Sequence, residues 1–127
     1  MVIAASAIIL KDKKILLVKR SNYTSVFPNT WVCPGGRANS NENPKEAVIR
    51  EVKEEVNLDF IPKKLFKTGI YEGRELFRFI GDFSGNIIIQ NDELTDFSWF
   101  SYSDAIKLDL GFDYKELIEN LRNENLF

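Results

Sequence analysis

Residues 34–58 constrain the fold of this chain more than any other segment, because a Pro-Gly-Gly turn precedes a strong helix-start pattern. Asn43 suits the N-cap position, Pro44 suits the first helical position, and Glu46 stands three residues after the cap. An apolar stripe follows at every fourth residue, formed by Val48, Val52 and Val56. Asn57 comes next, and asparagine can adopt the left-handed backbone conformation that commonly ends a helix. The pattern therefore predicts a core-facing helix that ends at Asn57 with a positive φ.

The same helix carries three glutamates on one face. At about 100° per residue, Glu51 lies between Glu54 and Glu55 in projection, away from the valine stripe. Like charges at this spacing repel, so a solvated acidic face is one interpretation and a divalent-cation site is the other. The turn at Gly35 and Gly36 must lie close to this helix, and glycine lets the backbone approach a ligand. We expect an exposed carboxylate patch at which a metal and a phosphate group can meet.

The rest of the chain alternates between short strands and helices. Residues 2–10 and 14–20 are apolar runs around a polar turn, which predicts a β-hairpin, and residues 21–30 are predicted as a loop. Further strands are expected at residues 64–71, 75–83, 86–90 and 97–100, and helices at residues 101–108 and 114–122. With 127 residues and no repeat or linker, we expect a single domain over residues 1–127. The order of the elements predicts an α/β fold, a mixed sheet covered by helices on both sides.

The chain contains no histidine and only one cysteine, Cys33. Serine–histidine catalysis, cysteine–histidine catalysis and histidine-ligated zinc are thereby excluded, and hard oxygen ligands favour Mg²⁺, Mn²⁺ or Ca²⁺. A single cysteine cannot form an internal disulfide, and the apolar start of the chain is too short to span a bilayer, so we expect a cytoplasmic protein without a membrane partner. A net charge of −2 is not typical of a protein that binds a long nucleic acid, which needs a basic surface. A small phosphorylated substrate is compatible with this charge.

The spacing of the charged residues and the glycine in this segment is typical of a known family. Gly36 is followed after five residues by Glu42, and seven residues later comes the run Arg50-Glu51-Val52-x-Glu54-Glu55-x-Asn57-Leu58. This arrangement resembles the signature of the Nudix (MutT-type) hydrolase family. The resemblance extends to Trp31-x-x-Pro34-Gly35-Gly36 and to Trp99-Phe100-Ser101. Asn57 departs from the family glycine at its position, and we expect a modest stability cost with no lost chemistry. The resemblance implies the Nudix fold, a mixed β-sheet sandwiched between helices.

The resemblance also implies a role for each residue of the signature. The metal ligands would be one backbone carbonyl and three carboxylates, those of Gly35, Glu51, Glu54 and Glu55, and the ion would be Mg²⁺ or Mn²⁺. Glu42 would serve in the inner or outer shell of the metal. Arg50 would orient the glutamates through charge-assisted hydrogen bonds, and simple i,i+4 pairing with Glu54 is the alternative.

The sequence leaves the general base open. In the family the base is either a glutamate of the signature or an acid from a later loop, so Glu51 and Glu93 join Arg50 as the expected catalytic residues. Asp92 and Asp96 are further alternatives to Glu93, and a merely solvated loop is the plain interpretation of all three loop acids. Three aromatic residues are candidates for stacking on a base, although core or rim positions are commoner for such residues: Tyr23, Phe27 and Trp31. Four arginines are candidates for contacts with phosphates: Arg20, Arg37, Arg74 and Arg78.

The implied function is metal-dependent cleavage of the diphosphate linkage in a small nucleotide-like substrate, such as a nucleoside triphosphate or a nucleoside diphosphate sugar. A catalytically silent nucleotide sensor of the same fold is one alternative, and its mark would be a broken signature. A structural domain whose acidic helix only faces water is the other. Asn39 and Asn41 stand where relatives often have Glu and Gly, which leaves the substrate open. The sequence also leaves a homodimer open.

Overall fold

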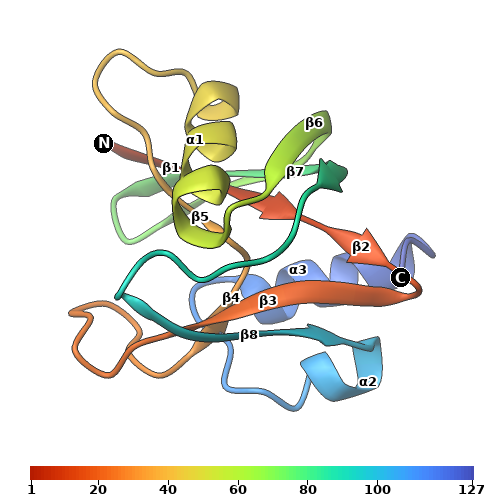
Figure 1. Cartoon of the computed structure of the whole chain (residues 1–127). Coiled ribbons are helices and arrows are strands. Elements are labelled where there is room, and N and C mark those ends of the chain that lie inside the picture. Colours follow the sequence, from red (N-terminus) through yellow and green to blue (C-terminus); the bar gives the residue numbers. More distant parts are fainter. The chain divides into compact units, whose positions relative to one another are not determined.

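The computed structural model describes all residues from Met1 to Phe127, and its tertiary contacts divide them into two compact units. The first unit consists of Met1–Ile9 and Pro34–Asn91, and the second of Leu10–Cys33 and Asp92–Phe127. Each unit contains a sheet with a helix packed on it (Figure 1). None of the helices has the length and the apolar character needed to cross a membrane.

A mixed sheet in the strand order β5-β1-β7-β6 forms the first unit. β1 (Val2–Ile8) runs parallel to β7 (Arg74–Ser84) and antiparallel to β5 (Gly35–Arg37). β6 (Asp59–Tyr71) pairs antiparallel with β7. α1 (Pro44–Val56) contacts β1, β5 and β6. The helix that carries the acids is therefore packed against the strand that contains the two glycines.

The hairpin predicted for residues 2–10 and 14–20 is wrong over most of its length. β1 pairs with β5 and β7, and only the two-residue β2 (Leu10–Lys11) pairs with β3 (Lys14–Arg20). Residues 5–9 are all buried, each with at most 2% of its surface exposed. A strand buried on both faces is typical of the interior of a mixed sheet, whereas a hairpin with one solvated face shows alternating burial.

The strand predicted for residues 86–90 is also absent. The backbone amides of Ile88 and Gln90 donate to the carbonyls of Val56 and Glu55, at 3.0 and 2.9 Å. The Gln90 side chain donates to the carbonyl of Lys53 at 2.8 Å. The last carbonyls of a helix have no partner within the helix. This segment therefore binds the C-terminus of α1 instead of joining a sheet.

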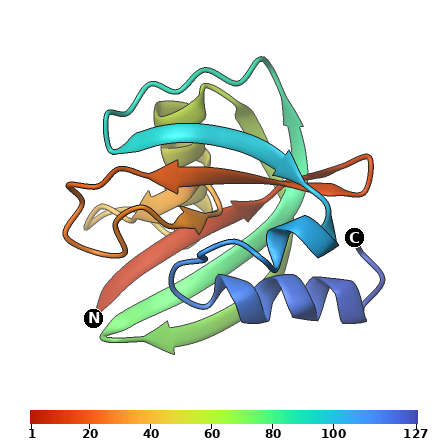
Figure 2. The same ribbon diagram turned by 90° about the horizontal axis from the view of Figure 1, so that it is seen from below.

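An antiparallel sheet forms the second unit, and β3 is its central strand. β3 pairs with β2, with β4 (Trp31–Val32) and with β8 (Leu94–Phe100); Figure 2 shows β3 in orange beside β8 in cyan. α2 (Tyr102–Ala105) contacts β3 and β8. The Ser101 hydroxyl accepts from the amide of Asp104 at 3.3 Å, so the predicted cap is confirmed, although the helix is shorter than predicted.

α3 (Tyr114–Asn123) lies in the second unit and contacts α2. Its apolar face is fully buried, as the spacing of its leucines and isoleucine predicted: Leu117, Ile118 and Leu121 each have 0% exposure.

Candidate active site

The local geometry of α1 follows from the residues at its two ends. Asn43 accepts a hydrogen bond from the amide of Glu46 at 2.8 Å, and the Glu46 carboxylate accepts from the amide of Asn43 at 3.1 Å, so a complete capping box begins the helix. Asn57 ends the helix with φ 65° and ψ 19°. The valine stripe is fully buried. These contacts confirm the predicted helix and place its last two turns beside β5.

Arg50 binds three carboxylates at once. Its Nε and Nη2 donate to the two oxygens of Glu42 at 2.6 and 2.9 Å, and its Nη1 donates to Glu51 at 2.9 Å and to Glu54 at 3.0 Å. Nη2 also donates to the carbonyl of Arg37 at 3.0 Å. The simple i,i+4 pair with Glu54 is thus one contact among five. The guanidinium lies at the centre of the acidic cluster.

Glu42 is held in place by the arginine and by the loop that contains it. The amide of Asn39 donates to Glu42 Oε1 at 2.8 Å, in addition to the two bonds from Arg50. The hydrogen bonds from Arg50, with that from Asn39, lower the pKa of Glu42 from 4.5 to about 2. The carboxylates of Glu42 and Glu51 in turn raise the pKa of Arg50, which stays charged. Glu42 is therefore ionised at neutral pH and stays ionised well below the usual pKa of a glutamate.

Glu51 lies against the backbone of Gly36. A Cβ atom built on Gly36 would be only 2.5 Å from the carboxyl carbon and from Oε2 of Glu51, so any other residue at position 36 would displace the carboxylate. Burial raises the pKa of Glu51, although its hydrogen bond with Arg50 acts in the opposite direction. A nearby cation would offset the cost of burying this charge.

Glu55 is buried, which the helix geometry alone did not predict. It has 9% exposure, and its Oε1 accepts a hydrogen bond from the amide of Gly35 at 2.9 Å. The three glutamates therefore differ in exposure, whereas an exposed patch was expected. The side chain of Glu54 is 58% exposed and that of Glu51 is 18% exposed. The physical reason is that β5 packs over one side of α1 and covers the residue that faces it. Apart from the glycine pair itself, no local pattern indicates that the Gly35 amide donates to Glu55.

The donor chemistry of this cluster fits a hard divalent cation, since all its side-chain acceptors are carboxylate oxygens. The close approach of Gly36 to Glu51 also keeps a backbone segment and a carboxylate together, as a shared ligand would require. In the arrangement described here, however, no three such side chains converge as a metal-binding group. Glu51 and Glu54 share Nη1 of Arg50, so binding of a cation would require at least the exposed Glu54 to turn toward it.

The loop acids named as alternative bases belong to the second unit. Asp92, Glu93 and Asp96 are exposed and lie before or at the start of β8. The carbonyl of Glu93 accepts from the amide of Ser21 at 2.8 Å, and Asp96 Oδ1 accepts from the amide of Phe97 at 2.8 Å. These contacts help to order the loop, and all three acids remain exposed.

The aromatic residues considered for base stacking pack within the second unit. The ring of Phe27 lies 4.6 Å from that of Phe112, and Trp31 meets Phe100 edge-on at 5.0 Å. Tyr23 is 63% exposed, and its hydroxyl donates to the carbonyl of Asp92. The packing of Phe27 and Trp31 favours the core interpretation for both rings.

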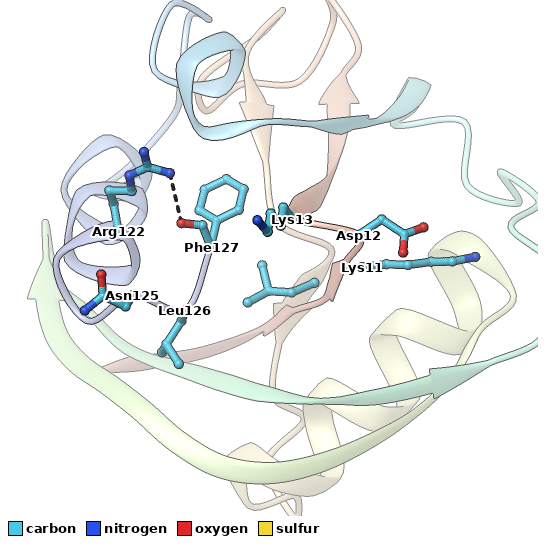
Figure 3. A pocket seen from close by; sticks show the side chains of 8 residues that line it. Lys11, Asp12, Lys13, Arg122, Asn125, Leu126 and Phe127 are labelled. Atoms are coloured by element: carbon cyan, nitrogen blue, oxygen red, sulfur yellow. Dashed lines mark hydrogen bonds between the residues drawn. The ribbon is translucent and has the colours of Figure 1, made fainter.

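A pocket of about 470 Å³ in the second unit has a different chemistry (Figure 3). It lies between the β2–β3 turn and the end of the chain, with Arg122 donating to the carbonyl of Phe127 at 3.2 Å. Among its lining side chains only Asp12 is acidic, against the cations of Lys11, Lys13 and Arg122. It therefore lacks the carboxylate cluster that the predicted reaction needs.

Comparison with known proteins identifies the family in which this arrangement occurs. The chain matches the family model described as "NUDIX domain" over residues 1–121. It is similar to an ADP-ribose pyrophosphatase of Methanocaldococcus jannaschii, with 33% identity over 126 residues, which is 93% of this chain and 71% of that protein. It is also similar to the nucleoside triphosphatase NudI of Escherichia coli, with 30% identity over 118 residues, which is 81% of this chain and 84% of that protein.

A solved structure shares the fold. The MutT protein from Methanosarcina mazei superimposes with a TM-score of 0.81 and 24% identity, covering 98% of this chain and 94% of that one. The predicted fold class, a Nudix fold of mixed β-sheet and flanking helices, is thereby confirmed.

Proposed function

Because this chain belongs to the Nudix family of hydrolases, we propose that it is a divalent-metal-dependent pyrophosphohydrolase that cleaves the diphosphate linkage of a nucleoside diphosphate derivative. One observation supports this proposal above the others: Arg50 binds Glu42, Glu51 and Glu54 beside the two glycines of β5. With Glu55, the cluster contains four carboxylates and one guanidinium, so negative charge is in excess where a cation is expected.

In this proposal the four metal ligands come from α1 and β5: Glu51, Glu54, Glu55 and the carbonyl of Gly35. Glu42 is bound through both oxygens to Arg50 and so takes a supporting place outside the ligand set. Mg²⁺ or Mn²⁺ is the proposed ion. When bound, such an ion neutralises diphosphate oxygens and acidifies a water molecule.

Arg50 and Glu42 act together in this proposal as an orienting pair. The bidentate contact fixes the guanidinium, and the remaining Nη1 then sets the positions of Glu51 and Glu54. Planar, two-point pairing of this kind gives geometric specificity that a lysine could not provide. Arg50 and Glu42 thus hold the acids in place without contacting the reacting phosphorus.

The proposed general base is Glu51, with Glu93 as the alternative. Glu51 is half-buried and its pKa is raised by that burial, which brings a carboxylate closer to the pH at which a base accepts a proton efficiently. Glu93 comes from the loop before β8, as the resemblance to the family allows. Glu51→Gln and Glu93→Gln, compared in pH–rate profiles, distinguish the two, because only loss of the true base removes the acidic limb of the profile.

The relatives indicate which substrates to test first. One is named for ADP-ribose, a nucleoside diphosphate sugar, and the other for nucleoside triphosphates. We propose ADP-ribose as the first substrate, followed by a panel of nucleoside triphosphates and diphosphate sugars. We also propose that residues 1–127 act as one catalytic domain, for which the match over residues 1–121 is the support.

The deciding experiment measures hydrolysis of this panel, with the nucleoside 5′-monophosphate and the second phosphorylated product, pyrophosphate or a sugar phosphate, identified chromatographically. The parent chain is assayed with Mn²⁺, with Mg²⁺ and with EDTA, beside Glu54→Gln and the matched control Glu119→Gln on the exposed face of α3. Hydrolysis that requires metal, is lost in Glu54→Gln and persists in Glu119→Gln supports the proposal. Tight nucleotide binding without any turnover would instead identify a sensor of the same fold.

A further inference from the structure

Arg78 is a buried cation that the proposed mechanism does not use. It lies on β7 with 3% exposure, and its Nη1 donates to the hydroxyl of Ser6 on β1 at 3.0 Å. Ser6 is itself 2% exposed. Burying a guanidinium is costly unless its hydrogen bonds are satisfied, so the contact with Ser6 is a substantial constraint on both side chains.

Ser6 lies in one row of the sheet with Arg78 and Gly35. It is paired with Arg78 across the parallel β1–β7 ladder and with Gly35 across the antiparallel β1–β5 ladder. Because β1 lies between β7 and β5, the bond to Arg78 turns the Ser6 hydroxyl toward β7 and away from Gly35.

The flank of Ser6 that faces Gly35 is tightly packed. A Cβ atom built on Gly35 would lie 2.6 Å from Ser6 Cα and 2.9 Å from Ser6 Cβ. No free space separates Ser6 from Gly35, so a movement of the Ser6 side chain toward β5 after loss of its bond to Arg78 would be transmitted to Gly35. A buried hydroxyl oxygen that has lost its donor turns toward another donor, and any such rotation toward β5 would push the backbone of Gly35 away from β1.

Gly35 in turn holds Glu55, because its amide donates to Glu55 Oε1 at 2.9 Å. We propose that Arg78 is a positioning residue: by holding the Ser6 hydroxyl on the β7 side, it lets Gly35 pack against β1 and align its amide with Glu55. This inference rests on the proposed function, in which Gly35 and Glu55 are metal ligands. Displacing Gly35 by a fraction of an ångström would change both ligands together.

The test combines two substitutions and measures hydrogen exchange of the Gly35 amide in metal-free protein, which reports on the bond to Glu55 without any metal. Arg78→Met should lower Gly35 protection and weaken Mn²⁺ binding about tenfold, as loss of outer-shell partners typically does. The turnover number should fall with the metal affinity, while KM changes little. Arg78→Lys, which can still donate to Ser6, should recover most of the loss.

The second substitution is Ser6→Ala, which is tested alone and in combination with Arg78→Met. Alanine has no hydroxyl that could turn toward Gly35, so Ser6→Ala alone should keep Gly35 protection and Mn²⁺ affinity within about twofold of the parent. In the double variant, Ser6→Ala should suppress the defect of Arg78→Met, since removing both members of a buried polar pair is often nearly neutral. Ser21→Ala, a serine with 1% exposure in the second unit, is the matched control and should change none of these quantities.

Two outcomes would overturn the inference. One is parent-like Gly35 protection in Arg78→Met, and the other is a double variant as poorly protected as the single one. If Arg78→Met alone fails to fold, the double variant decides: a protected Gly35 amide supports the inference, and an unprotected one refutes it. A parent chain that binds no Mn²⁺ would refute the proposed function, whereas the exchange data would still test the link from Arg78 to Gly35.

Discussion

Arg50 is the residue on which the charge balance of the candidate site depends. Its five hydrogen bonds use all three nitrogens, and four of them end on carboxylates. Replacing it by an uncharged residue would leave Glu42, Glu51 and Glu54 close together with no cation between them. At the scale of single residues, one side chain therefore binds three of the four acids of the candidate site.

The lowered pKa of Glu42 predicts how the stability of the protein depends on pH. Its pKa is lowered to about 2 in the folded protein from 4.5, so its contribution to stability is complete above pH 4.5 and is lost as pH falls from about 4.5 to about 2. Glu42→Gln should therefore be less stable than the parent at pH 7, and the difference should shrink steadily below pH 4.5. Urea unfolding at a series of pH values measures this. A stability difference that is the same at pH 7 and pH 3 would contradict the assigned cause.

Glu55 and Glu51 should respond differently to the same substitution. Glu55→Gln keeps the shape but removes a negative charge, so Mn²⁺ affinity and turnover should both fall, the latter by ~10²–10³. If Glu51 is the base, Glu51→Gln should lower turnover more than it lowers metal affinity. Calorimetric titration with Mn²⁺ beside initial-rate assays separates these effects. Normal Mn²⁺ binding and parent turnover in Glu55→Gln would remove Glu55 from the ligand set.

The burial of Glu55 also changes the stability expected for its variant. An exposed, self-repelling patch predicts unchanged or higher stability for Glu55→Gln in the absence of metal. Since Glu55 accepts from the Gly35 amide and is 9% exposed, a neutral acceptor should instead cost up to about 1 kcal/mol. Urea unfolding in EDTA measures this cost.

α1 is the element that brings the site together, and its two ends differ in how they are formed. The N-terminus is closed by its own residues through the capping box. The C-terminus is closed by Asn57, whose side chain donates to the carbonyl of Asn86, and by Ile88 and Gln90. These two residues donate to carbonyls of the last turn, those of Lys53, Glu55 and Val56. The positions of Glu54 and Glu55 therefore depend on contacts made by Ile88 and Gln90, which lie more than 30 residues later in the chain.

Asn57 provides a prediction at the scale of this element. Glycine tolerates a φ of 65° better than asparagine, but Asn57→Gly also loses the bond from Nδ2 to the carbonyl of Asn86 at 3.3 Å, so stability and activity should change little. Asn57→Ala should lose about 1–2 kcal/mol, because alanine has no compensation for the left-handed conformation. Thermal unfolding and initial rates of both variants check this. A large loss of activity in Asn57→Gly would contradict the capping account.

At the scale of the whole molecule, the absence of histidine limits which metals can support activity. With no histidine and one buried cysteine, the chain has only oxygen donors for a metal at the candidate site. Activity should be abolished by EDTA, restored by Mg²⁺ or Mn²⁺, and unaffected by a chelator selective for zinc. Rates measured after each treatment test this, and full activity in EDTA on every diphosphate substrate would exclude the metal mechanism. The cytoplasmic location and the homodimer stay untested.

Local interactions are what the sequence by itself determined. The caps of α1, the buried valine stripe, the positive φ of Asn57 and the spacing of Arg50 from Glu54 all involve residues within about four positions of one another. The geometry of a single helix decides such contacts, and the part of the Nudix signature from Arg50 to Asn57 lies on this helix and its C-cap.

Only the tertiary structure decided which distant segments meet. An apolar run such as β1 does not reveal its partners, so its pairing with β7, about 70 residues away, could not be inferred. The segment from Asn86 to Gln90 has the apolar content of a strand but binds helix carbonyls instead. Glu55 is buried because β5 covers it, and Arg78 lies beside Ser6 because their strands are neighbours. Burial and long-range pairing depend on the packing of whole elements, which no local spacing specifies.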